Sequence, residues 1–248
     1  MKAWVYRKDE ADNSGLHLFQ EDIPQPKPVA GQVLVQTKKV SVCGTDESLF
    51  KGDLKRVPDH VVPGHEFYGE IVELGSGVKG FQVGQKIAGE SHYQVPGIDD
   101  QGIIGLWGPE IRKGESLPAL NGAYAEYLCI PAECAHPVPD EYVDADFWPS
   151  LFEAIGNDYF LIKHATQKNG IQKLGVFGCG PHGLFAQIFA KHFGIAKIAA
   201  FEIDDFRRDF AKQMEAADAV FNPANELQQS VRDFTSGTMF DATLDMQN

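Results

Sequence analysis

Apolar and polar residues follow different periods in the two halves of the chain. In residues 1–143, short alternating or β-branched runs are separated by turn-forming stretches rich in glycine and proline, which predicts a β-rich half. The runs that we predict as strands cover residues 2–7, 32–42, 66–74 and 125–131. Short strands at regular spacing are typical of a β-barrel or a sandwich.

From about residue 144 onward, the apolar positions recur at helical spacing. Residues 144–165 predict a long helix, with Asp144 or Asp146 as its N-cap. Beyond it the pattern predicts strands at 173–180, 197–203, 219–222 and 240–246, and helices at 181–194, 204–217 and 224–235. Alternating strands and helices of these lengths indicate right-handed βαβ units in a parallel sheet, so this half is predicted to be α/β.

Composition narrows the class of protein. The 248 residues suffice for one large domain or two ordinary ones, and 43% of them are apolar. The formal net charge of −13 disfavours nucleic acid or an anionic membrane as a partner. The N-terminus lacks the apolar core of a signal peptide, and no apolar run is long enough to span a membrane. The four cysteines are scattered, as reduced thiols are, and we expect a soluble, cytoplasmic protein.

A G-x-G-x-x-G motif, formed by Gly178, Gly180 and Gly183, follows a predicted strand and opens the next helix. The motif by itself is weak, but strand–turn–helix is the context in which it binds a dinucleotide. The glycines permit a tight turn and close approach of the backbone to a pyrophosphate at the helix N-terminus. Pro181 suits the first helical turn, and we place it with His182 among the cofactor-binding residues. A βαβ turn without a ligand is the alternative.

Glu202 ends the following strand, about 20 residues beyond Gly183. A carboxylate at that point accepts hydrogen bonds from the ribose hydroxyls of the adenosine and repels a 2′-phosphate, which favours NAD over NADP. Arg207 lies nearby in the sequence and is a further cofactor-binding candidate that softens this preference. Cys179, inside the loop, is interpreted as a small filler rather than a reactive thiol.

A second set of candidate residues lies in the β-rich half. Cys43, in the stretch "SVCGTDESLF", is a buried filler, a redox thiol or a metal ligand, and its neighbours alone leave all three open. His65 and Glu66 lie together just before a predicted strand, where such a pair is more often structural than catalytic. With a nucleotide fold downstream, the three residues form a specific combination, although the roles of Cys43 stay open at this point.

Four stretches of the chain resemble the zinc-dependent medium-chain dehydrogenases, in particular the branch of sorbitol and threonine dehydrogenases. They are "VSVCGTDESLF", "VVPGHEFYGEIVELGSGVKGFQVGQKIAGESH", "GAYAEYLCIP" and "VFGCGPHGLFAQIFAKHFG", and together they extend over nearly the whole chain. The resemblance implies a GroES-like β-barrel catalytic domain at residues 1–155, followed by a partial Rossmann NAD-binding domain at residues 156–248.

The resemblance also implies a ligand set for one catalytic zinc ion. Cys43 and His65 match the family's first two ligands. Glu66 matches the adjacent carboxylate, which binds zinc directly or exchanges with water, so we count it among the catalytic residues as well. Glu153 matches the acidic ligand of polyol and threonine dehydrogenases, and it competes with Glu66 for the role of resting third ligand. Three protein ligands leave the fourth position of a catalytic zinc to water or substrate.

The chemistry that the resemblance implies is hydride transfer between a secondary alcohol and C4 of the nicotinamide. Thr45 occupies the position of the hydroxyl residue that takes the alcohol proton. Asp46 either fixes the His65 imidazole or caps the short helix that follows. Many relatives carry a histidine that passes the proton to solvent, and this chain has Ser48 there, which we count among the catalytic candidates. The proton relay therefore uses water or runs elsewhere, with His92 as a candidate.

Two further departures concern the structural zinc and the length of the chain. Residues 93–120 contain none of the closely spaced cysteines that bind a structural zinc in relatives, so we expect a metal-free loop. The family continues beyond the last predicted strand, so the chain is a fragment or a partner covers that strand's edge.

We therefore expect a zinc- and NAD-dependent oxidoreductase that acts on a secondary alcohol of a small polyol, sugar or amino-alcohol and forms a homo-oligomer. The alternative is a catalytically incompetent, truncated remnant that binds zinc, with or without nucleotide.

Overall fold

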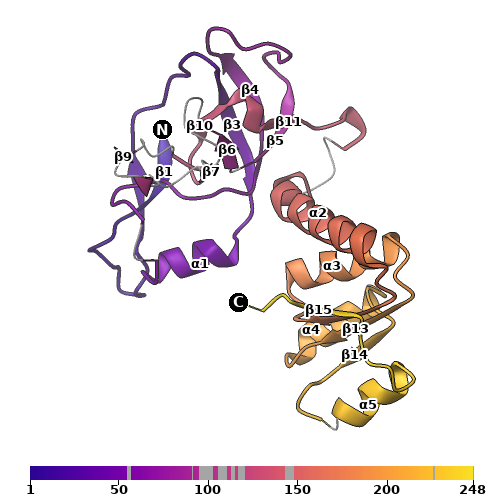
Figure 1. The fold of residues 1–248 in the computed structure, drawn as a ribbon. Helices are drawn as coiled ribbons and strands as arrows, with labels where there is room; N and C mark the ends of the chain where they lie inside the picture. Colours follow the sequence, from indigo (N-terminus) through magenta and orange to yellow (C-terminus); the bar gives the residue numbers. More distant parts are fainter. Residues whose placement is uncertain are drawn as a thin grey trace. The chain divides into compact units, whose positions relative to one another are not determined.

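The two halves of the chain form two compact units. The fold, obtained as a computed structural model, describes residues 1–54, 57–90, 92–94, 103–105, 111–112, 115–116, 121–142, 148–225 and 227–247 (Figure 1). One unit comprises Met1–Glu153 and the other Ala154–Asn248. The boundary expected after residue 155 lies within one helical turn of this division.

The first unit is built on a five-stranded antiparallel sheet. Its strands are β3 (Gln32–Val40), β4 (Phe67–Leu74), β5 (Lys86–Gly89), β10 (Tyr127–Pro131) and β11 (Ala135–Pro137), in the order β10-β3-β4-β5-β11 (Figure 1). The pairing of β3 with β4 shifts register between Leu34 and Val35 and again between Thr37 and Lys39. Such bulges increase the twist of a sheet and bend it, and the predicted β-rich class of this half is confirmed.

Alternation along the strands supplies the core of this sheet. Val33 and Val35 of β3 are fully buried and pack in one apolar cluster with Ile71 of β4 and Ile87 of β5. The strand pairing sets Val35 opposite Ile71. Burying a side chain of this size stabilises the fold by about 1.5–3 kcal/mol, so the cluster holds the strands that lead to the candidate metal ligands.

The remaining elements of the first unit are short. β1 (Lys2–Tyr6) pairs antiparallel with β2 (Leu18–Asp22), and α1 (Gly44–Phe50) follows β3. The 3-10 turns η1 (Ala132–Cys134) and η2 (Asp140–Tyr142) flank β11. Two small antiparallel pairs join β6 (His92–Gln94) with β7 (Ile103–Gly105) and β8 (Ile111–Arg112) with β9 (Glu115–Ser116). The expected metal-free loop at residues 93–120 falls here and lies largely outside the described residues.

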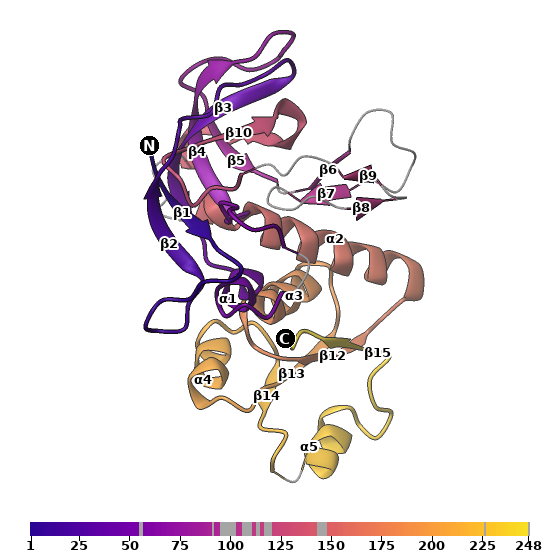
Figure 2. The same cartoon turned by 90° about the vertical axis from the view of Figure 1, so that its left-hand side faces the viewer.

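The second unit holds a four-stranded parallel sheet. Its strands are β12 (Lys173–Phe177), β13 (Lys197–Phe201), β14 (Ala219–Phe221) and β15 (Ala242–Asp245), in the order β14-β13-β12-β15 (Figure 2). The helices are α2 (Phe152–Asn169), α3 (Pro181–His192), α4 (Asp205–Gln213) and α5 (Leu227–Phe234). Each strand predicted for this half is present, and the Rossmann-like parallel sheet is confirmed.

Helices cover both faces of this sheet. Along β13, Ile198 packs in a cluster with Ile162 of α2 and Ala186 of α3. The next residue, Ala199, packs instead with Val231 of α5. Because successive side chains of a strand point to opposite faces, α2 and α3 cover one face and α5 covers the other. Burial on both faces explains why the two central strands, β12 and β13, are nearly continuous apolar runs.

The long helix begins later than its apolar pattern predicted. A 3-10 turn, η3 (Trp148–Leu151), precedes α2, which begins at Phe152. Pro149 lies in that turn and lacks the backbone N–H that a helix interior needs, so the α-helix starts after it. The expected N-caps Asp144 and Asp146 lie outside the described residues. Although α2 spans 18 residues, neither it nor another helix in the described ranges is apolar enough to cross a membrane.

Candidate metal and nucleotide sites

Three of the predicted metal ligands lie together in the first unit. The ligand atoms of Cys43, His65 and Glu66 all fall within 4.8 Å of one another. His65 and Glu66 are buried, with 9% and 6% of their surface exposed, and Cys43 is half-buried. Two segments that are distant in the sequence therefore converge on one point with little access to bulk water.

Backbone pairing brings these two segments together. β3 ends at Val40, and the next residue, Ser41, donates its backbone N–H to the carbonyl oxygen of Glu66 at 2.8 Å. Two residues later Cys43, whose backbone is still extended, forms the N-cap of α1. The convergence thus depends on how β3 pairs with β4, which spacing along the sequence does not reveal.

Asp46 links the cluster to the start of α1. Its side chain is fully buried, and its Oδ2 accepts the backbone N–H of Cys43 at 3.0 Å. Its other oxygen, Oδ1, lies 3.5 Å from Nδ1 of His65. Capping the helix and orienting the imidazole, the two roles open for Asp46, are therefore compatible in one geometry.

The charges of the cluster shift two pKa values. Burial alone would lower the pKa of His65, but hydrogen bonding to Asp46 and Cys43 outweighs burial and raises this pKa to about 10. Burial, followed by the charge of Cys43, raises the pKa of Glu66 to about 7. Several acidic groups around one imidazole form a site in which a cation is favoured.

The donor set fits zinc. A thiolate, an imidazole and a carboxylate are all ligand types that zinc takes in proteins. Neighbouring ligand atoms in a zinc tetrahedron lie roughly 3.5 Å apart. The distances between the ligand atoms of Cys43, His65 and Glu66 therefore have to shorten by only about an ångström for zinc to bind. Binding requires deprotonated thiol and imidazole, so the affinity of such a site rises with pH.

Glu153 lies outside this cluster of three ligand groups. It is buried in the first turn of α2, and its charge acts on the pKa values of both His65 and Glu66. Ser150, just before α2, shares a hydrogen bond with Ser41, with 2.7 Å between their hydroxyl oxygens. This bond ties the start of α2 to the segment that leads to the cluster. Ligation by Glu153 stays a prediction.

The residues expected to handle the proton follow Cys43 on α1. Thr45 is exposed, and its hydroxyl lies 3.8 Å from the Cys43 sulfur. Ser48 is half-buried and comes three residues later, so it lies on the same side of the helix as Thr45. The side chain of His92 lies outside the described residues. The roles of these residues in proton transfer stay predictions.

The nucleotide motif forms a tight turn in the second unit. β12 ends at Phe177, and α3 begins at Pro181 with Gly180 as its N-cap and no side-chain cap. A Cβ on Gly183 would fall 2.1 Å from the carbonyl oxygen of Gly178, so only glycine lets the helix start this close to the turn. A Cβ on Gly180 would meet nothing within 4 Å, so the space beside this glycine is open.

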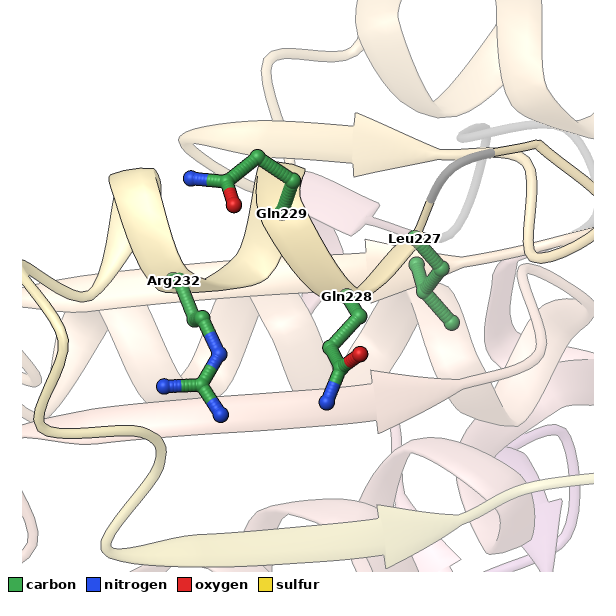
Figure 3. A pocket seen from close by; sticks show the side chains of 4 residues that line it. All are labelled: Leu227, Gln228, Gln229 and Arg232. Carbon is green, nitrogen blue, oxygen red and sulfur yellow. The ribbon is translucent and has the colours of Figure 1, made fainter.

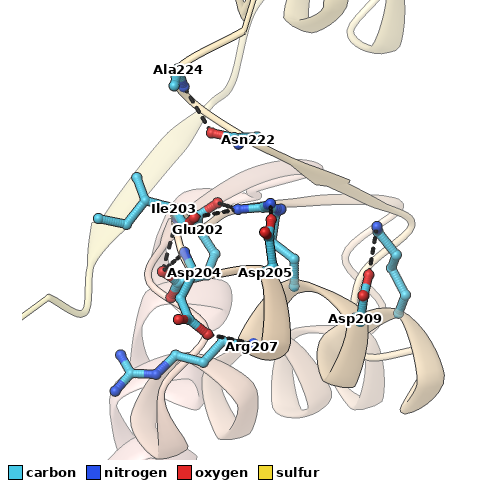
Figure 4. Close-up of polar contacts among 10 residues, drawn as sticks. Glu202, Ile203, Asp204, Asp205, Arg207, Asp209, Asn222 and Ala224 are labelled. Carbon is cyan, nitrogen blue, oxygen red and sulfur yellow. Dashed lines mark hydrogen bonds and ion pairs between the residues drawn. The ribbon is translucent and has the colours of Figure 1, made fainter.

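Glu202 holds this turn in place. Its carboxylate accepts the backbone N–H of Cys179 at 2.8 Å. It also accepts the backbone N–H groups of Ile203 at 2.8 Å and Asp204 at 3.0 Å (Figure 4). Burial alone would raise the pKa of Glu202, but these donors outweigh burial and lower it. A carboxylate offers about four acceptor positions, so one is left for a ribose hydroxyl.

Two arginines after Glu202 have different surroundings. Arg207 is exposed near the start of α4, where its backbone N–H donates to the N-cap Asp204 at 2.9 Å (Figure 4). Arg208 is buried and donates from Nη1 to the carbonyl oxygens of Glu202 at 2.9 Å and Ile203 at 2.5 Å. The side chain of Ile203 is 69% exposed directly after Glu202, and no sequence pattern singled it out.

Sequence patterns also missed two polar pairings beside the sites. Nδ1 of His182 lies 2.8 Å from Oδ2 of Asp158, which is buried on α2. The hydroxyl of Tyr124 lies 3.0 Å from Oδ2 of Asp46. Each pair joins distant parts of the chain, so no spacing rule connects its members. The one available signal was the position of Tyr124 in the stretch "GAYAEYLCIP".

A surface hollow of about 330 Å³ lies on α5 (Figure 3). It is lined by Leu227, Gln228, Gln229 and Arg232. None of these residues belongs to the candidate metal or nucleotide site, and the hollow is given no role in the function.

Comparison with known proteins covers both units. Residues 29–140 match the family model of the alcohol dehydrogenase GroES-like domain, and residues 181–248 match that of zinc-binding dehydrogenases. L-threonine 3-dehydrogenase of Alteromonas mediterranea is 32% identical over 252 residues, covering 99% of this chain and 70% of that protein. L-threonine 3-dehydrogenase of Pseudoalteromonas translucida is 31% identical over 236 residues, covering 92% and 67%.

Solved structures share the fold. Galactitol-1-phosphate dehydrogenase from Escherichia coli has a TM-score of 0.80 at 19% identity, over 99% of this chain and 68% of that one. 2R,3R-butanediol dehydrogenase from Bacillus subtilis has a TM-score of 0.78 at 24% identity, over 98% and 70%. At these identities the likeness is one of fold.

Proposed function

The chain belongs to the zinc-dependent medium-chain dehydrogenases, and on this premise we propose that it interconverts a secondary alcohol and a ketone by hydride transfer with NAD. The proposed substrate is a small polyol, sugar or amino-alcohol. The observation that carries the proposal is the convergence of Cys43, His65 and Glu66, with Glu153 buried at the start of α2. Relatives named as threonine dehydrogenases support an alcohol of this size.

In this proposal Cys43, His65 and one carboxylate hold the zinc, which when bound acidifies the hydroxyl of the substrate. Asp46 orients the imidazole of His65 from the Nδ1 side, which leaves Nε2 to the metal. The hydroxyl of Thr45 takes the proton from the substrate oxygen. Ser48, on the same side of α1, passes that proton on to water.

The preference for NAD follows from Glu202. Its remaining acceptor position suits a hydroxyl of the adenosine ribose, and its negative charge repels the additional phosphate of NADP. The pyrophosphate takes the space beside Gly180 at the N-terminus of α3. The exposed Arg207 acts in the opposite direction and limits the size of the preference.

Metal content and NAD reduction test the proposal together. We expect the full chain, expressed with zinc, to hold one zinc ion and to reduce NAD with an alcohol from a panel of threonine, sorbitol and butane-2,3-diol. Cys43→Ser should lose both zinc and activity, because the thiolate ligand is removed. Cys129→Ser, which changes a buried thiol of β10, is the control and should keep the zinc.

Two outcomes would contradict the proposal in different ways. A wild-type chain without zinc would overturn the metal site and the dehydrogenase with it. A chain that binds zinc and NAD but turns over no alcohol would favour the catalytically incompetent alternative.

A further inference from the structure

Tyr124 reaches the segment that carries Cys43. Its hydroxyl lies 3.0 Å from Oδ2 of Asp46 and 3.1 Å from the carbonyl oxygen of Ser41. Burial, followed by the charge of Asp46, raises the pKa of Tyr124, so the hydroxyl stays protonated and donates. The same Oδ2 accepts the backbone N–H of Cys43. A fully buried carboxylate depends on such donors, because an unpaired buried charge is costly.

Tyr124 also braces the segment that carries His65. Its backbone N–H donates to the carbonyl oxygen of Pro63 at 2.9 Å. Its ring lies against Gly64, where an added Cβ would fall 3.0 Å from the ring. Gly64 has a φ of +94°, a conformation that favours glycine, and His65 follows directly. One tyrosine therefore contacts both segments that supply the proposed zinc ligands.

We propose that Tyr124 is a positioning residue that sets the geometry of the zinc ligands through Asp46. The inference rests on the proposed zinc site. With the Tyr124 hydroxyl in place, the Asp46 carboxylate is held between the backbone of Cys43 and the imidazole of His65 before the metal binds. Without that hydroxyl, the carboxylate gains rotational freedom, and metal binding has to order it again.

Tyr124→Phe tests this role, because it removes only the hydroxyl. We expect the zinc affinity of the full chain, measured by competition with a chelator, to fall about tenfold, the lower end of the range for residues that support metal ligands. The cobalt-substituted variant should also show a changed d–d absorption spectrum, because the ligand geometry relaxes. Tyr127→Phe is the matched control. Tyr127 belongs to β10, and its hydroxyl lies 3.4 Å from Nε2 of Gln36. Loss of this hydroxyl should leave the zinc affinity and the cobalt spectrum unchanged.

A double-mutant cycle separates positioning from a general loss of stability. Asp46→Asn should weaken zinc binding, and adding Tyr124→Phe should then cost little more, because both changes break the same chain of contacts. Additive losses would overturn the inference. So would a change of less than about twofold in Tyr124→Phe with an unaltered cobalt spectrum. If Asp46→Asn does not fold, the zinc affinity and the cobalt spectrum of Tyr124→Phe are sufficient to test the inference. A wild-type chain that binds no zinc overturns the proposed function instead.

Discussion

Asp46 and Glu202 have similar surroundings, although they lie in different units. Each is a buried carboxylate that accepts backbone N–H groups, Asp46 from Cys43 and Glu202 from Cys179 and two further residues. Charge-assisted bonds of this kind are about twice as strong as neutral ones. At the scale of single residues, each carboxylate therefore fixes a short piece of backbone at its candidate site. Asp46 does so at the metal site and Glu202 at the nucleotide site.

Substitution of Glu153 separates the two alternatives for the third zinc ligand. We expect Glu153→Ala to weaken zinc affinity by 10- to 100-fold, roughly the loss known for residues that only support ligands, or by more. Glu153→Cys should restore the affinity, because a thiolate is also a zinc ligand. Competition with a chelator measures both. Glu133→Ala, an exposed glutamate of η1, is the control. Unchanged affinity in Glu153→Ala would assign the ligand role to Glu66.

The donors around Glu202 also predict how stability depends on pH. They lower its pKa in the folded protein, so the unfolded chain binds the proton more tightly. The stabilisation is complete above the unfolded pKa of about 4.3 and is lost as pH falls through the folded pKa. Glu202→Gln should therefore lower the melting temperature near neutral pH, and the gap to wild type should narrow in acid. If the difference in melting temperature between wild type and Glu202→Gln stayed constant from neutral to acidic pH, the lowered pKa of Glu202 would be contradicted.

At the scale of elements, two glycines of one turn are expected to respond differently to alanine. Gly183→Ala places a Cβ 2.1 Å from a carbonyl oxygen, so it should lower the melting temperature. Gly180→Ala meets nothing within 4 Å, so the melting temperature should hold while the affinity for NAD falls. Thermal melts and NAD titrations of both variants test this. If Gly180→Ala bound NAD as tightly as wild type, the proposed position of the pyrophosphate at this turn would be contradicted.

Strands were easier to predict than helix starts. β12 and β13 are buried on both faces and lie within their predicted runs, because a continuous apolar stretch between turn residues has few alternatives. α1 has only seven residues and no apolar period, so no pattern indicated its bounds. The predicted beginning of α2 was too early. Apolar residues keep their helical spacing through Pro149, but proline lacks the backbone N–H that an α-helix needs, so the helix begins after it.

The candidate metal site was predictable from resemblance more than from pattern. Local sequence left Cys43 with three roles, and only its match to a family tied it to His65. The contact between them depends on strand pairing and on the bond from Ser41 to Glu66, which are tertiary features. Tyr124 was not predicted at all, because its bond to Asp46 spans 78 positions of the chain.

At the scale of the whole molecule, each unit contains one candidate site and its own apolar core. A ligand stabilises the unit that binds it, by about 2.7 kcal/mol at a hundredfold excess over Kd. We therefore expect calorimetry to show two transitions, one raised by zinc and the other by NAD. Adding a zinc chelator as a control should reverse only the rise in the temperature of the zinc-dependent transition. A single transition that both ligands raise equally would contradict independent units.

The bond from Glu202 to the Cys179 backbone has a consequence for coenzyme engineering. A library that randomises Glu202 to admit NADP would also release the glycine-rich turn, so its members would lose stability as well as change their coenzyme preference. The productive route keeps the carboxylate and varies the exposed side chains of Ile203 and Arg207, where added positive charge offsets the repulsion between Glu202 and the 2′-phosphate.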